Sequence, residues 1–341
     1  NTIYNGTVSN NKSEGYAVQR DENGFIVGTF TNDNFYEGIY KYKNTTYVVR
    51  KNKDDEINGD GLFLYNDGDY IYVGGINKDY QKHGDGIIYI LNDFDDWKKG
   101  DYFIDNYEND DLLLDYKSNL DKCLLDEKGF VDSKNKCFAD EDVNDMRSVG
   151  IFENYELKLG FIYYSLDEGN YLKVGQFNEF ELNGYGLETN PDKKFLHGGQ
   201  YEKGNPDGYA INIHDDGTKF YGVIDKDFYA NGIGYEISKN DEIFFGIYRN
   251  NKPFGYGENH FKEGYYYKGN MNGDKFNGVF EILFDNDDFY YGQIQNTQFN
   301  GFGSYKSANG EIEQGLWKND KFEEELVFCR KLNTNYYYQK K

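Results

Sequence analysis

Glycine recurs at a nearly constant interval along most of this chain. We call the glycine that begins each interval the first-position glycine. From residue 150 onward, seven of these are each followed nine or ten residues later by a second glycine, as Gly246 is by Gly255. An aromatic residue usually stands two positions before the first glycine, as Phe244 does. Self-similarity at a fixed period of 20 to 50 residues indicates a repeat architecture. The first-position glycines are spaced by 23 to 25 residues, at Gly150, Gly175, Gly199, Gly222, Gly246, Gly269, Gly292 and Gly315.

The N-terminal third carries the same period in a more divergent form, with Val49 in one of the glycine positions. This gives about thirteen units in all, by the period that defines a repeat of this kind. The first-position glycines there are Gly6, Gly28, Gly74 and Gly100.

Each unit is predicted to form one β-hairpin. The residues around the first glycine are strongly β-prone, a polar turn follows, and the second glycine starts another short strand. A single hairpin is marginally stable, so the units must stack. Glycine within a strand marks close backbone approach, and we expect aromatic rings of one unit to cover the Gly-x-Gly of the next. The predicted fold is all-β: an elongated, twisted, single-layer antiparallel sheet of stacked hairpins with one irregular insertion.

The period is interrupted once and ends before the C-terminus. We therefore predict N-terminal repeats over 1–103, an acidic insertion over 104–147, C-terminal repeats over 148–322 and a tail over 323–341. The tail follows the last repeat, where an array needs a cap to hide its open edge. A peptide handle for a partner is the alternative role for the tail.

The insertion holds 13 acidic and six basic residues. One interpretation is a solvated segment between two blocks of repeats; the other is a functional loop docked on the sheet through apolar side chains. Calcium binding by its acidic residues is disfavoured, because the EF-hand ligand order with its central glycine is absent. The candidate docking residues are Leu112, Leu113, Leu114, Leu124, Leu125 and Phe130.

Composition excludes several classes of function. The chain has 60 acidic and 37 basic residues, a formal charge of −23, which argues against nucleic-acid binding. No apolar run approaches the ~18 residues of a membrane-spanning helix. The three cysteines are too few for a disulfide scaffold and lack zinc-ligand spacing, which favours a reducing, cytoplasmic setting. The four histidines show no metal-ligand spacing, and no nucleophile elbow or phosphate-binding loop is present. We expect no catalytic residues, metal or cofactor.

The glycine–aromatic pattern resembles the MORN repeat family. The resemblance rests on the Tyr-x-Gly segments, such as Tyr267–Gly269 and Tyr290–Gly292, followed by a polar turn and Gly-x-Gly. It implies a non-enzymatic, partner-binding scaffold of a cytoskeletal, ciliary or membrane-associated assembly, and several members of the family are dimeric. A radial-spoke-type subunit and an organiser of the cortical cytoskeleton are both compatible with it. Some family members are enzymes, but their catalytic domains are separate from the repeats.

Aromatic residues two positions after the first glycine recur on one face of the expected sheet. They either fill the packing between hairpins or line a trough, with acidic rims, that binds basic or amphipathic protein segments. Recruitment to anionic phospholipids is the alternative function, although the net charge of the chain would oppose it. The candidate partner-binding residues are Phe152, Phe177, Tyr201, Tyr248 and Trp317.

Overall fold

The computed structural model describes most of the chain and divides it into two compact units, Asn1–Tyr229 and Ala230–Lys341. The described residues are 3–50, 59–65, 70–90, 102–108, 110–143, 145–166, 169–190, 195–273, 275–331 and 334–339. We describe each unit by itself.

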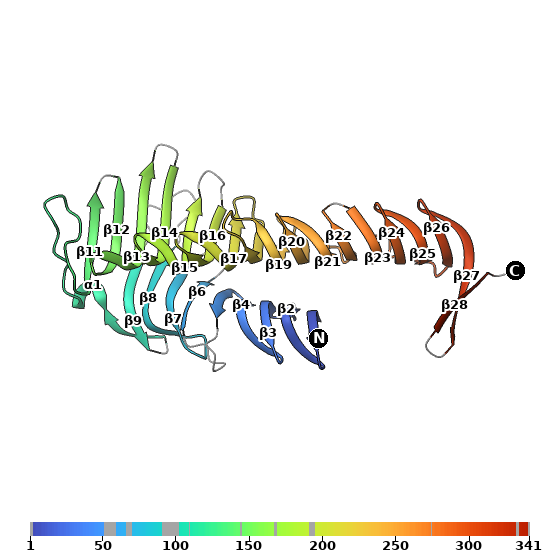
Figure 1. The fold of residues 1–341 in the computed structure, drawn as a ribbon, viewed down its shortest axis with the longest axis horizontal. Helices are drawn as coiled ribbons and strands as arrows, with labels where there is room; N and C mark the ends of the chain where they lie inside the picture. Colours follow the sequence, from blue (N-terminus) through green and yellow to red (C-terminus); the bar gives the residue numbers. More distant parts are fainter. Residues whose placement is uncertain are drawn as a thin grey trace. The chain divides into compact units, whose positions relative to one another are not determined.

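The first unit contains two antiparallel sheets in which every strand pairs with the next one along the chain (Figure 1). One short helix, α1 (Tyr116–Asn119), follows the first sheet. The strands of the first sheet are β1 (Ile3–Ser9), β2 (Lys12–Arg20), β3 (Gly24–Thr31), β4 (Asn34–Tyr42), β5 (Thr45–Arg50), β6 (Gly59–Tyr65), β7 (Tyr70–Ile76), β8 (Lys82–Ile90), β9 (Tyr102–Glu108) and β10 (Asp111–Asp115). The second sheet of this unit has β11 (Cys137–Val143), β12 (Met146–Glu153), β13 (Glu156–Leu166), β14 (Gly169–Asn178), β15 (Glu181–Asn190), β16 (Phe195–Glu202), β17 (Asn205–His214) and β18 (Lys219–Ile224).

The second unit continues the same meander of consecutive antiparallel strands. Its hairpins are joined alternately by short turns such as Asn250–Asn251 and by longer turns such as 238–242. Both residues of a short turn have positive φ, a conformation that asparagine tolerates well. The strands are β19 (Ala230–Ile237), β20 (Ile243–Arg249), β21 (Lys252–His260), β22 (Tyr266–Asn272), β23 (Lys275–Leu283), β24 (Phe289–Gln295), β25 (Gln298–Lys306), β26 (Ile312–Lys318), β27 (Lys321–Lys331) and β28 (Thr334–Gln339).

The repeated glycines lie side by side across the strands, in a line that we call the glycine row. Gly246 pairs with Gly257, which pairs with Gly269 on the next strand. Aromatic rings cover this row, but within one unit rather than from one unit to the next as predicted: a Cβ on Gly303 would collide with the ring of Tyr290, which lies on the neighbouring strand of the same repeat. Glycine is required at these positions because the rings lie directly on the backbone.

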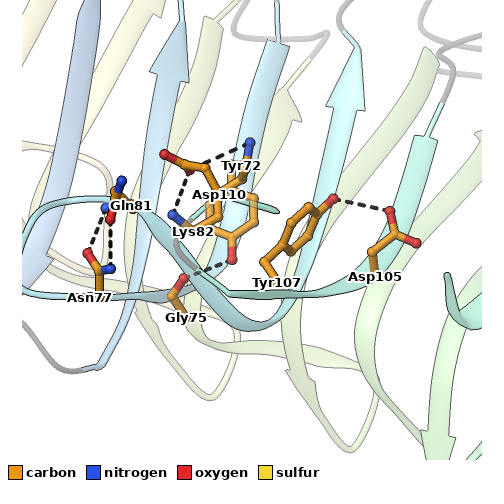
Figure 2. Close-up of polar contacts among 8 residues, drawn as sticks. All are labelled: Tyr72, Gly75, Asn77, Gln81, Lys82, Asp105, Tyr107 and Asp110. Atoms are coloured by element: carbon orange, nitrogen blue, oxygen red, sulfur yellow. Dashed lines mark hydrogen bonds and ion pairs between the residues drawn. The ribbon is translucent and has the colours of Figure 1, made fainter. Parts of the chain in front are cut away.

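Hydroxyl groups fix several of these rings. The Tyr72 hydroxyl donates to the carbonyl oxygen of Gly75 at 2.8 Å (Figure 2), and Tyr290 makes the same bond to Gln293 three residues ahead, also at 2.8 Å. Each ring is buried, so its polar end needs a partner. The recurrence of this bond shows that the same local structure forms in both units.

A second recurring contact joins each hairpin to the next. The Asp110 amide donates to the Lys82 carbonyl at 3.0 Å, and the Asp110 carboxylate accepts from the Lys82 amide at 2.9 Å (Figure 2). In the second unit, Asp320 makes the corresponding pair of bonds to Phe299, at 3.1 and 2.7 Å. Turn residues therefore hold adjacent repeats together.

The face opposite the glycine row is aliphatic in the first unit. Ile39 pairs with Val48, which pairs with Leu62, and all three are fully buried. The equivalent face of the other sheet carries residues such as Phe161, whose ring lies 5.5 Å from that of Tyr89. The two aliphatic faces thus pack against each other, and the apolar area that they bury stabilises the unit.

The all-β class built of stacked hairpins is confirmed, but the expected single layer does not hold in the first unit. Residues 104–147 lie where the chain passes from one sheet to the other, and they contain β10, α1 and β11. The predicted boundaries at 103/104 and 147/148 fall inside β9 and β12. The first unit has two layers because a single-layer sheet would leave its aliphatic face in water.

The three cysteines include one disulfide, between Cys123 and Cys137. The expectation of a fully reduced chain is therefore wrong for this pair. One bridge does not make a disulfide scaffold, but it closes a short loop within the segment that joins the two sheets.

Candidate partner-binding surface

The five aromatic residues that the sequence nominates lie in the interior. None is more than 4% exposed. Phe152, Phe177 and Tyr201 belong to one core cluster with Leu157 and Leu182, and Trp317 donates its indole N–H to the carbonyl oxygen of Gly303 at 3.3 Å. Of the two roles that the sequence allows, this burial favours packing between hairpins over direct contact with a partner.

Two of the five residues are tyrosines whose buried hydroxyl lies beside a carboxylate. The Tyr201 hydroxyl lies 3.4 Å from Glu188, and the Tyr248 hydroxyl lies 3.4 Å from Glu236. Burial first, and then the neighbouring carboxylate, raises the pKa of both tyrosines well above the usual value. Both tyrosines therefore remain protonated and serve as donors within the packed array.

The candidate docking residues of the insertion are exposed where the structure describes their side chains. Leu124 is 72% exposed, and Phe130, the least exposed, is 36% exposed. The Leu114 side chain lies outside the described residues. These side chains do not pack on a sheet, so the structure gives them no docking role. The others are Leu112, Leu113 and Leu125.

A polar cluster around Asp85 attaches the insertion instead. Lys136 forms an ion pair with the Asp85 carboxylate at 2.8 Å, Asn106 donates to it at 2.8 Å, and the Tyr116 hydroxyl also donates to it. Burial alone would raise the pKa of Asp85, but these three donors outweigh it and lower the pKa. No spacing in the sequence indicates this cluster, because its four members come from β8, β9, α1 and the loop before β11.

The second unit presents a different kind of surface on the side of its sheet opposite the glycine row. We call this the open face. Alternation along a strand places residues immediately before a first-position glycine, such as Lys268 and Tyr291, on this side. Among the residues of this unit whose side chains the structure describes, the exposed large hydrophobic ones all lie there: Ile247, Tyr256, Val279, Tyr291 and Ile312.

Charged groups form a network in the middle of the open face. Lys268 lies between Glu258 and Glu281 on adjacent strands and forms an ion pair with Glu281 at 2.9 Å. The Tyr266 hydroxyl donates to Glu281 at 2.6 Å, and His260 Nε2 lies 3.1 Å from Glu258. Burial alone would raise the pKa of Glu281, but the bonds from Tyr266 and Lys268 lower it. Glu281 is thus held ionised on a half-buried surface.

Stacked rings support the network. The Phe245 ring lies nearly parallel to that of His260, with centroids 5.6 Å apart, and His260 stacks on Tyr266 at 5.4 Å. Burial, and then the bond to Glu281, raises the pKa of Tyr266 to about 12. Burial and the nearby Glu258 do the same for Tyr256, to about 12. The network is therefore already formed in the chain alone.

Net charge is distributed unevenly between the two units. Residues 1–229 carry 44 acidic and 24 basic side chains, whereas residues 230–341 carry 16 and 13. Most of the net negative charge, which the sequence analysis expects at the rims of a trough, therefore lies on the first unit. Among the residues that the structure describes, no three His, Cys, Asp or Glu side chains gather as a group that could hold a metal ion.

Comparisons with known proteins add little to this geometry. No protein-family model matches the chain, and no curated protein matches its sequence. One solved structure that matches weakly is the SAS-4 (dCPAP) TCP domain of Drosophila melanogaster in complex with a proline-rich motif of Ana2 (dSTIL). The match has a TM-score of 0.19 and 13% identity, and it covers 54% of this chain and 90% of that one. A likeness at this TM-score carries no argument about function.

Within the described part of the chain, none of the helical structure is long and apolar enough to cross a membrane.

Proposed function

We propose that the chain is a non-enzymatic scaffold of MORN-like repeats that binds a protein segment on the open face of the second unit. The observation that carries the proposal is the combination of exposed apolar side chains with a pre-formed network of Glu258, Lys268 and Glu281. Exposed apolar side chains interspersed with polar groups on one face of a sheet are typical of interaction sites. Large rings such as Tyr291 supply contact area at little cost in conformational entropy.

The chemistry of the face favours an amphipathic segment with basic side chains. Two carboxylates flank the single amine of Lys268, and the adjacent long turns add Glu263, Asp285 and Asp287. Apolar side chains of the partner would cover Ile247 and Ile312, while its cations would meet these acids. By the family resemblance, the scaffold would belong to a cytoskeletal or ciliary assembly in the cytoplasm and could form a homodimer.

Paired substitutions test the proposal. We expect Tyr256→Ser with Tyr291→Ser to weaken recovery of a stoichiometric partner at least tenfold in pull-downs with the full chain, because such rings dominate binding energy. The matched control is Tyr16→Ser with Tyr155→Ser, which removes two exposed tyrosines of the first unit. If the first pair retains the partner as well as the control pair does, the open face is not the binding site.

A second candidate function is recruitment to anionic phospholipid, and one observation favours it. Five exposed basic residues flank the short turns at one margin of the second unit: Arg249, Lys252, Lys275, Lys318 and Lys321. Clusters of this kind attract anionic headgroups. Flotation with vesicles of anionic and neutral lipid at physiological salt separates the two functions. Binding that requires anionic lipid, and that is lost when these residues become Glu, would favour recruitment.

A further inference from the structure

The outer edge of β11 is covered at Phe138 by a short segment of the same chain. The Cys123 amide donates to the Phe138 carbonyl at 3.0 Å, and the Phe138 amide donates to the Asp121 carbonyl at 2.9 Å. The segment 121–125 thus pairs with β11 as a parallel bridge at Lys122. An edge strand left bare would offer these backbone groups to another chain.

The disulfide lies directly beside these two bonds. Cys123 belongs to the covering segment and Cys137 to the first position of β11, with their Cα atoms 5.1 Å apart. Cys137 is buried at 4% exposure, whereas Cys123 is half-buried. A reductant can therefore approach the bridge from the side of Cys123.

Apolar burial contributes little to holding the covering segment. Leu124 is 72% exposed and Leu125 is 50% exposed, so Cys123 is the one apolar side chain of the segment that packs against a core cluster. Its remaining ties are local: the Leu124 amide donates to Ser133 Oγ at 2.7 Å, and the Asp132 amide donates to the Leu124 carbonyl at 2.7 Å. The covalent link and the two backbone bonds at Phe138 thus join this segment to the strand edge.

We propose that the Cys123–Cys137 disulfide is a redox-operated latch that holds the segment 121–125 on the outer edge of β11, and that reduction releases this segment so that a second copy of it can bind the edge. A thiolate of a dithiol reductant attacks Sγ of Cys123, and the S–S bond breaks with Cys137 leaving as a thiolate that takes up a proton. The second thiol of the reductant then displaces Cys123. Two electrons and two protons pass to the protein, and the dithiol becomes a disulfide.

Hydrogen exchange measured by mass spectrometry tests the latch. The Cys329→Ser variant of the full chain is used with and without dithiothreitol, so that only the two paired cysteines can react with the reductant. We expect reduction to speed exchange at the Cys123 and Phe138 amides at least tenfold, while the Val174 amide inside the same sheet keeps its protection. Unchanged exchange at Phe138 would overturn the proposal, and so would loss of protection at Val174, which would make the bridge a staple of the whole unit.

A peptide measures the opened edge directly. The probe is a synthetic copy of residues 119–127 with Ser in place of Cys123, which supplies the strand that the latch normally holds. We expect it to bind the reduced chain, and the Cys123→Ser variant of the chain, at least tenfold more tightly than the oxidised chain. Equal binding to the oxidised and reduced chains contradicts the latch, as does rapid alkylation of Cys123 and Cys137 in protein that was never reduced.

Discussion

At the scale of the residue, His197 shows how far this fold buries polar groups. Its ring is fully buried between Tyr201 and Phe228, with ring centroids 5.3 and 5.1 Å away. Nδ1 lies 2.6 Å from the Asn212 side-chain oxygen, whereas Nε2 has no hydrogen-bond partner among the described residues. Burial lowers the pKa of His197 to about 4, and the Asn212 bond offsets this only in part.

This histidine makes folding sensitive to acid. Below its ordinary pKa of about 6.5 the unfolded chain takes up a proton that the folded chain refuses until about pH 4, so stability is lost as the pH falls through that window. We expect a loss of about 3 kcal/mol, from ~1.4 kcal/mol per pKa unit. Urea unfolding of wild type and His197→Gln between pH 7 and pH 4 measures it, because the variant lacks the titrating group. Parallel stability profiles for the two proteins would rule this effect out.

The glycine row makes a steric prediction. Gly303→Ala should destabilise the second unit by about 1–3 kcal/mol, because the added methyl group collides with the Tyr290 ring. The cost should shrink when the same change is made in a Tyr290→Ala background, since the ring is then absent. Denaturant unfolding of the four proteins of this double-mutant cycle gives the coupling energy. Additive effects would mean that the ring does not require glycine there.

At the scale of the element, the hairpin and its contact to the next repeat are the unit of construction. Asp320 illustrates this contact, since its amide and carboxylate bond the carbonyl and amide of Phe299 twenty-one residues earlier. The carboxylate also accepts from Gln298 at 3.0 Å. One exposed side chain thus fixes the spacing of two neighbouring repeats.

Removing that carboxylate should loosen the stack. Alanine is strained at the positive φ of Asp320, so the control must share that backbone conformation. Asp287→Ala, at an exposed turn position with φ 65°, is the matched control, and we expect Asp320→Ala to cost about 1 kcal/mol more than it, the usual net worth of such a hydrogen bond. Asp320→Asn should cost less because it keeps an acceptor. Equal effects of Asp320→Ala and Asp287→Ala in urea unfolding would refute the role of this contact.

The hairpins could be predicted from the sequence, but their assembly into two layers could not. The glycine period and the turn residues are local signals, and they indicate strands correctly. Packing of one sheet on another depends on where the chain reverses, and the segment 104–147 that does this carries no repeat. The disulfide in that segment was equally out of reach, because spacing alone does not bring Cys123 and Cys137 together.

The candidate surface was missed for a definable reason. The sequence directs attention to aromatic residues two positions after the first glycine, such as Phe152 and Trp317, which share the face of the glycine row and are buried. The informative position is the one immediately before that glycine. It changes from aliphatic, as at Val149 and Val174, to polar or exposed, as at Lys268.

At the scale of the whole molecule, one repeat serves two purposes according to that single position. In the first unit the position is mostly valine, as at Val27, Val73, Val149 and Val174, and a second sheet covers this face. In the second unit it carries charged and aromatic groups whose apolar neighbours are exposed. The same backbone thus builds a two-layer core in one unit and a surface suited to binding in the other.

Hydroxyl-radical footprinting of two adjacent tyrosines tests this central claim most directly. Tyr290 lies on the glycine row and is 0% exposed, whereas Tyr291 lies on the open face and is 55% exposed. The two residues share their chain neighbourhood and intrinsic reactivity, so exposure alone separates them. We expect Tyr291 to be oxidised at least tenfold faster than Tyr290 in the native chain. Equal rates, or faster oxidation of Tyr290, would contradict a sealed glycine row and an open opposite face.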